Sequence, residues 1–180
     1  MKFKALALAL ALSASLFTGC TEAKDKVVEE EKKMEDKVNE GADVVTSPSK
    51  ATDKASLEKA LKDSWIVILE KDVTTDKDVV LEGGFKKDDK AASRVLAMYK
   101  SGENKEVVES YTLTTPKLII KDENAKIEGG TLKGDIYVEA NGVKIEGVKV
   151  EGNVYFSKEE YKTSFHMDDK SSVSGAQEVK

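Results

Sequence analysis

The sequence is poor in several residue types that commonly build functional sites. Its 180 residues include one cysteine, Cys20, and one histidine, His166. His166 has no partner at the spacing that metal binding or general-base catalysis requires. Of the 29 basic residues only Arg94 is an arginine, and lysine is the poorer bidentate ligand for phosphate. Together with the net charge of −5, this argues against a nucleic-acid partner.

Apolar residues are also scarce. They make up 39% of the chain, while charged residues make up 35%. A shortage of this size indicates that part of the chain does not contribute to a hydrophobic core. The length suits one domain with appendages.

The first residues, MKFKALALALALSASLFTGC, are typical of an export signal. Lys2 and Lys4 precede an apolar run that is too short, at about 15 residues, to span a membrane as a helix. The segment LFTGC resembles the lipobox of bacterial lipoproteins, although Phe17 stands where leucine is commoner. The resemblance implies that Cys20 is acylated with fatty chains such as palmitate and becomes the mature N-terminus. An ordinary secreted protein with an incidental cysteine is the alternative.

Four segments are expected along the chain. Residues 1–19 form the signal peptide, and residues 20–55 form a charged tether, disordered or partly helical, that lacks aromatic residues. Residues 56–170 form the β domain, which begins with a short amphipathic helix that has Ser56 as its N-cap. Residues 171–180 form a frayed tail.

A thirteen-residue segment occurs twice. KIEGGTLKGDIYV at 126–138 returns eighteen residues later as KIEGVKVEGNVYF at 144–156. In both copies apolar residues expected to face inward alternate with residues expected to face outward, which is the two-residue period of a strand. Glycines recur at fixed places where the chain turns. The residues expected to face inward from the first copy are Ile127, Leu132, Ile136 and Val138.

This repeat length favours a parallel β-helix, or β-solenoid, in which each coil stacks on the previous one and buries a continuous core. An antiparallel β-sandwich with duplicated hairpins is the alternative. The order of a helix, a Trp/Ile/Val strand and glycine-punctuated coils resembles the start of pectate-lyase-like right-handed β-helix proteins over residues 56–156. The resemblance implies that the helix caps the N-terminal end of the core. Residues 86–112 break the period, and SGEN at 101–104 indicates a hairpin turn.

The residues that carry catalysis in that superfamily are not evident here. The resemblance implies an Arg or Lys beside calcium-binding carboxylates, but Arg94 has no acidic pair in register, and no aspartate column lies between residues 116 and 156. We therefore expect no catalytic residues, no metal site and no cofactor.

One outward column could bind a ligand. In the β-helix register Ile119, Tyr137 and Tyr155 lie above one another, and stacked aromatic side chains can hold sugar rings. Packing beneath residues 86–112 or beneath the tail is the alternative explanation for these residues.

These features predict a non-enzymatic protein that is lipid-anchored on the extracytoplasmic face of the cell membrane and serves as a scaffold or binding module. Its partners would be the membrane, through the lipid on Cys20, and a cell-wall glycan or another envelope protein. Two alternatives stay open: a glycan-active enzyme of the pectate-lyase-like group, and a self-assembling envelope protein whose end coils stack on one another.

Overall fold

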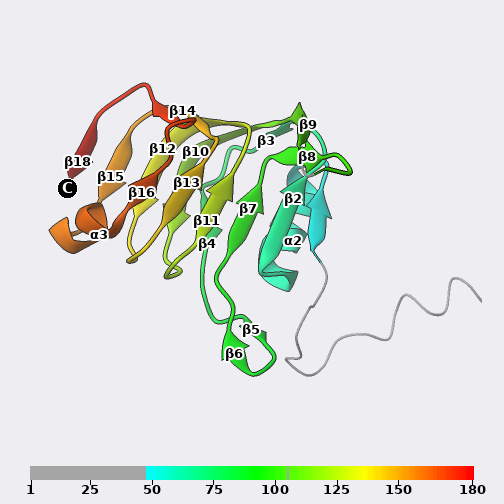
Figure 1. Cartoon of the computed structure of the whole chain (residues 1–180), viewed down its shortest axis with the longest axis horizontal. Helices are drawn as coiled ribbons and strands as arrows, with labels where there is room; N and C mark the ends of the chain where they lie inside the picture. The colour runs from blue at the N-terminus through cyan, green and yellow to red at the C-terminus, as the bar shows by residue number, and fades with distance from the viewer. Residues whose placement is uncertain (1–47, 105) are drawn as a thin grey trace, which may run out of the picture. The chain divides into compact units, whose positions relative to one another are not determined.

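The computed structural model describes residues 48–104 and 106–180, and within them the protein is mostly β. The strands of its two main sheets pair in parallel (Figure 1). The antiparallel sandwich is therefore wrong as an alternative. The expected signal peptide, Cys20 and residues 20–47 of the expected tether lie outside the described residues.

One sheet has six strands. The order of the strands across this sheet is their order in the sequence, because each strand pairs with the strand of the same sheet that follows it along the chain. In that order the strands are β1 (Ser49–Ala51), β2 (Ile66–Leu69), β7 (Val95–Ala97), β11 (Lys126–Glu128), β13 (Lys144–Glu146) and β16 (His166–Met167).

The second sheet has eight strands and is organised around two long ones. β10 (Thr112–Ile120) pairs with β12 (Thr131–Val138), and each of them also pairs with two shorter strands on its other side. The shorter strands of this sheet are β3 (Val73–Thr74), β4 (Val79–Leu81), β14 (Lys149–Glu151), β15 (Val154–Phe156), β17 (Ser172–Val173) and β18 (Gln177–Val179).

Two hairpins and two helices complete the described structure. The hairpins are antiparallel and interrupt the parallel pattern between residues 86 and 110. The hairpin strands are β5 (Lys86–Lys87) with β6 (Lys90–Ala91), and β8 (Tyr99–Ser101) with β9 (Val107–Ser110); the helices are α2 (Lys54–Asp63) and α3 (Glu159–Ser164).

The two copies of the repeated segment lie side by side in register. Ile127 pairs with Ile145 in one sheet, and Tyr137 pairs with Tyr155 in the other. The four residues expected to face inward from the first copy are fully buried, as are their partners Ile145 and Val154. The eighteen-residue spacing therefore predicts the strand register correctly, because a whole period separates each residue from its neighbour in the ladder.

The N-terminal boundary of the domain differs from the expected one. Strand β1 already pairs with β2, and Ala51 is fully buried, so the ordered domain includes residues before Ser56. The helix N-cap is Asp53, not Ser56. The Asp53 carboxylate accepts the Ser56 backbone N–H at 2.8 Å, while the Ser56 hydroxyl accepts the Asp53 N–H at 3.0 Å, which forms a reciprocal capping box.

The C-terminal boundary also differs. Residues 171–180 are not a frayed end, because β17 pairs with β14 and β18 pairs with β15, both in parallel. Hydrogen bonds along these ladders hold the segment, even though its sequence has few apolar residues to indicate a strand.

The non-periodic segment 86–112 contains the expected hairpin at SGEN, formed by β8 and β9. It also contributes β7 to the six-stranded sheet, where Leu96 pairs with both Val67 and Ile127. The hairpins are thus insertions on either side of one regular strand.

The backbones of β10 and β12 approach closely at a register shift between Thr114 and Lys117. Gly134 of β12 has φ +142°, and a Cβ atom there would lie 1.9 Å from the carbonyl oxygen of Thr115. Only glycine fits this position, which explains one of the recurring glycines by close backbone contact.

We expect Ile145→Asp to lower the free energy of unfolding by more than about 3 kcal/mol, since it places an unpaired carboxylate in the continuous core. Lys144→Asp is the matched control, because it introduces the same side chain on the outward face of the same strand, between Lys126 and His166. Urea denaturation of both variants measures the difference. Equal effects would contradict the assignment of these faces.

Candidate functional site

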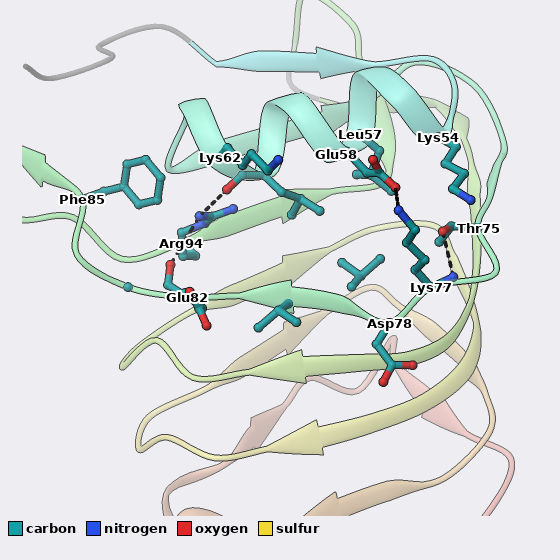
Figure 2. Close-up of a pocket in the computed structure, with 14 residues that line it drawn as sticks. Lys54, Leu57, Glu58, Lys62, Thr75, Lys77, Asp78, Glu82, Phe85 and Arg94 are labelled. Carbon is teal, nitrogen blue, oxygen red and sulfur yellow. Dashed lines mark hydrogen bonds and ion pairs between the residues drawn. The ribbon is translucent and has the colours of Figure 1, made fainter. Parts of the chain in front are cut away.

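The described part of the chain has a cleft of about 630 Å³ between helix α2 and the segment 75–85, which includes β4 (Figure 2). A volume of this size is within the range of small-molecule sites, which is about 300–1,000 Å³. Aliphatic side chains of α2 and β4 line its walls, and charged side chains lie around them. Arg94, which precedes β7, closes one end near Phe85 (Figure 2).

Helix α2 is held in place by one apolar face and by its N-terminal cap. Leu57 and Ala60 are buried in the core, and the helix packs against β1, β2 and β3. Leu61, one residue further, is partly buried beside the core and also lines the cleft. The same amphipathic pattern that docks the helix therefore supplies one wall of the cleft.

Among the described residues Arg94 has the largest fully buried side chain, with only 1% of its surface exposed. Its Nη1 donates to the carbonyl oxygens of Leu61 at 3.0 Å and Glu82 at 3.3 Å. The Leu61 carbonyl belongs to the last turn of α2, where a cation is favoured by the helix dipole. The Phe85 ring lies 4.7 Å from the guanidinium carbon, a cation–π distance.

The other edge of the guanidinium has no acceptor in the described structure. Both Nε and Nη2 are buried and donate no hydrogen bond. Leaving buried donors of a charged group unsatisfied is costly, so such atoms call for a physical explanation. These two nitrogens belong to the same edge, because Nη2 lies on the side of the Nε–H bond.

Two carboxylates lie near Arg94, but both have other interactions. Asp122 Oδ2 accepts the backbone N–H of Arg94 at 2.6 Å, and the Glu82 carboxylate, which is mostly exposed, lies 3.7 Å from Lys121 Nζ. Gly83 leaves room for the Asp122 side chain, since a Cβ atom there would lie 2.4 Å from Oδ1.

Burial shifts the titration of this pair. Burial lowers the pKa of Arg94, and the charges of Asp122 and Glu82 oppose that shift. Burial also raises the pKa of Asp122, and the hydrogen bond from the Arg94 N–H and the guanidinium charge oppose it. Both directions show that removal from water outweighs the local charge compensation.

The rim of the cleft carries ion pairs. Lys77 Nζ lies 3.1 Å from Glu58, so it connects the 75–85 segment to α2, and Lys54 pairs with Asp76. Lys54 and Lys77 are thus partly neutralised by carboxylates, Lys62 also lines the cleft, and Arg94 is the buried cation of the site.

The expected column is formed, but its aromatic groups already have partners. Ile119 pairs with Tyr137 and Tyr137 with Tyr155, whose rings are 5.1 Å apart, and all three side chains are half-buried. Lys117 lies over the Tyr137 ring at 5.2 Å, and Lys180 lies over the Tyr155 ring at 3.4 Å. The column therefore offers less free aromatic surface than the sequence suggests.

Val80 joins the column to the cleft. It pairs with Ile119 at the start of the column and lines the cleft as well. The cleft and the column are thus neighbouring parts of one outward face of the eight-stranded sheet.

The remaining sequence-based sites are placed as follows. Cys20 lies outside the described residues, and His166 is exposed in β16. Among residues 48–104 and 106–180, no three His, Cys, Asp or Glu side chains group as metal ligands. The sequence argument missed the burial of Arg94. The available signal was a single arginine in a lysine-rich chain.

No known protein family matches the chain, and no curated protein or solved structure is significantly similar to it. Within the described residues, no helix has the length and apolar character needed to cross a bilayer.

Asp122→Asn should change how stability depends on pH. The folded-state pKa of Asp122 is raised above its ordinary 3.8, so the unfolded chain releases this proton first as the pH rises. The free energy of unfolding of the wild type therefore falls as the pH rises between the unfolded-state and folded-state pKa values of Asp122. The variant has no carboxyl group at this position and lacks this decrease. Relative to wild type, the variant should gain stability as the pH rises from the ordinary pKa of 3.8 through the raised pKa of folded Asp122. The measurement is the melting temperature of both proteins as a function of pH. If the two curves run parallel, the raised pKa of Asp122 is contradicted.

Proposed function

We propose that this protein is a lipid-anchored, non-catalytic binding module on the extracytoplasmic face of the cell membrane, and that its ligand occupies the cleft beside Arg94. The observation that carries the binding role is the cleft itself, which combines aliphatic walls with a buried cation that has two unpartnered donors. Ligand sites usually combine apolar walls with polar groups that fix the orientation of the ligand, and charged side chains complete the lining here.

The proposed scaffold is a parallel β-solenoid. Supporting it are the in-register pairs Ile127–Ile145 and Tyr137–Tyr155, which lie in different sheets and share one eighteen-residue period. In such a scaffold α2 would cover the N-terminal end of the core, as the resemblance to pectate-lyase-like proteins implies.

The proposal of a non-catalytic role rests on how the groups near Arg94 are used. Its Nη1 binds two carbonyl oxygens, and Asp122 accepts a backbone N–H, so this pair is engaged in holding the fold. The glycan-active enzyme remains the alternative, and depolymerisation of an acidic glycan by the purified chain would favour it.

A cell-wall glycan on the tyrosine column is a second candidate, favoured by the 5.1 Å pair of Tyr137 and Tyr155. Self-assembly is a third. Met167 and Val179, on the last strands of the two sheets, are 39% and 38% exposed, so apolar surface is present where another copy could add strands.

Native mass spectrometry of the full-length protein purified from its own membranes tests the cleft. We expect a small molecule to be retained by the wild type and lost from Val80→Trp, which fills the cleft from a half-buried strand position that accepts aromatic residues. Lys149→Trp, on the exposed surface of β14, is the control and should retain it. Retention by all three proteins would place the ligand elsewhere.

Anchoring is tested at Cys20. Cys20→Ala should abolish labelling by a fatty-acid probe, leave the precursor uncleaved by the lipoprotein peptidase and remove the two acyl chains that hold the protein on the membrane. Labelling and membrane fractionation of wild type and variant measure this. A variant that is still acylated would contradict the anchor.

A further inference from the structure

The unpaired edge of the Arg94 guanidinium has the geometry of a carboxylate site. Nε and Nη2 present two roughly parallel N–H bonds, and the two oxygens of a carboxylate accept such a pair in a bidentate manner. The opposite side of the group is already fixed by the carbonyl oxygens of Leu61 and Glu82. The fork is therefore preorganised, with its orientation set before any ligand binds.

A purely structural role explains only part of this arrangement. Nη1 alone donates both hydrogen bonds, including the one to the last turn of α2. A lysine could supply that single point of contact, and lysine supplies every other basic residue of the chain. Arginine adds a planar face, which lies against the Phe85 ring, and a second edge, which is the edge that has no acceptor.

Arg94 lines the cleft, and apolar side chains form part of the same lining, with charged side chains around them. Leu57 and Leu61 line it from the helix, Val79 and Val80 line it from β4, and the ring of Phe85 lies against the guanidinium. These walls suit a hydrocarbon body, since burying apolar surface contributes about 25 cal/mol per Å².

We propose that the cleft binds a carboxylic acid with an apolar body, whose carboxylate pairs with Nε and Nη2 of Arg94 and whose body lies along α2 and β4. This inference rests on the proposed binding function and specifies its ligand class. A single negative charge is favoured over a doubly charged phosphate, because the Asp122 and Glu82 carboxylates already lie near the guanidinium.

The test uses the whole mature polypeptide, residues 20–180, with Cys20→Ser to keep it free of lipid. Because Arg94 is the sole arginine, the protein has one arginine Nε–H signal in a ¹H–¹⁵N spectrum. Three probes distinguish the effect of the ligand's charge from that of its apolar body. They are cyclohexanecarboxylate, the uncharged cyclohexylmethanol and inorganic phosphate.

Cyclohexanecarboxylate should shift the Nε–H signal in a saturable manner, whereas cyclohexylmethanol should bind at least about tenfold more weakly and leave the signal in place. Arg94→Lys keeps the charge but loses the fork, and should weaken cyclohexanecarboxylate binding by about tenfold or more in calorimetry. If Arg94→Lys fails to fold, Val80→Trp provides the test instead. Val80→Trp should abolish cyclohexanecarboxylate binding, whereas Lys149→Trp should leave it unchanged.

Other outcomes overturn the inference in distinguishable ways. If the acid and the alcohol bind equally without moving the Nε–H signal, the cleft is a ligand site but Arg94 does not select a carboxylate. If phosphate shifts the signal as strongly as the acid does, the apolar body is irrelevant. If no probe binds while native mass spectrometry still finds a ligand in the cleft, the ligand class is wrong and the proposed function stands.

Discussion

The described structure depends on parallel ladders in which each strand buries the apolar residues of the next. Ile127 lies between Leu96 and Ile145 in the ladder, and all three side chains are fully buried. A single strand pair could not exclude water from these side chains, so stability arises from the stack and not from any one turn. The same constraint explains why Gly134 is required, since it lets the backbones of two long strands approach at a register shift.

The cleft follows from how this stack begins. The first strand pairs with β2, helix α2 packs on these first strands, and the last turn of α2 leaves carbonyl oxygens that need donors. Arg94 supplies one, and in doing so it is drawn out of water, which lowers its pKa. One side chain thus joins the helix to the segment that leaves β4, and the same residue lines the cleft.

The sequence predicts the features that depend on periodicity and misses those that depend on long-range backbone contacts. The eighteen-residue repeat identifies the inward residues and the pairing of Tyr137 with Tyr155, because both copies carry the same alternation. It does not predict β17 and β18, whose polar residues are held by ladder hydrogen bonds. The cap at Asp53 is missed because Ser56 has the same cap chemistry three residues later, and the burial of Arg94 is missed because it requires three separate segments to meet.

The insertion of two hairpins before β10 has a consequence for the order of folding. Between β10 and β12 the ladder joins Leu118 to Ile136, which is 136 − 118 = 18 positions away, whereas Leu113 must find Val73, which is 113 − 73 = 40 positions away. The additional loop-closure entropy is about 0.7 kcal/mol, so the contacts of the later strands form at lower entropic cost. The C-terminal half can therefore nucleate first and serve as a template onto which β3, β4 and α2 dock. By this route the cleft is assembled last, and a destabilised chain would lose it while the later strands are still paired.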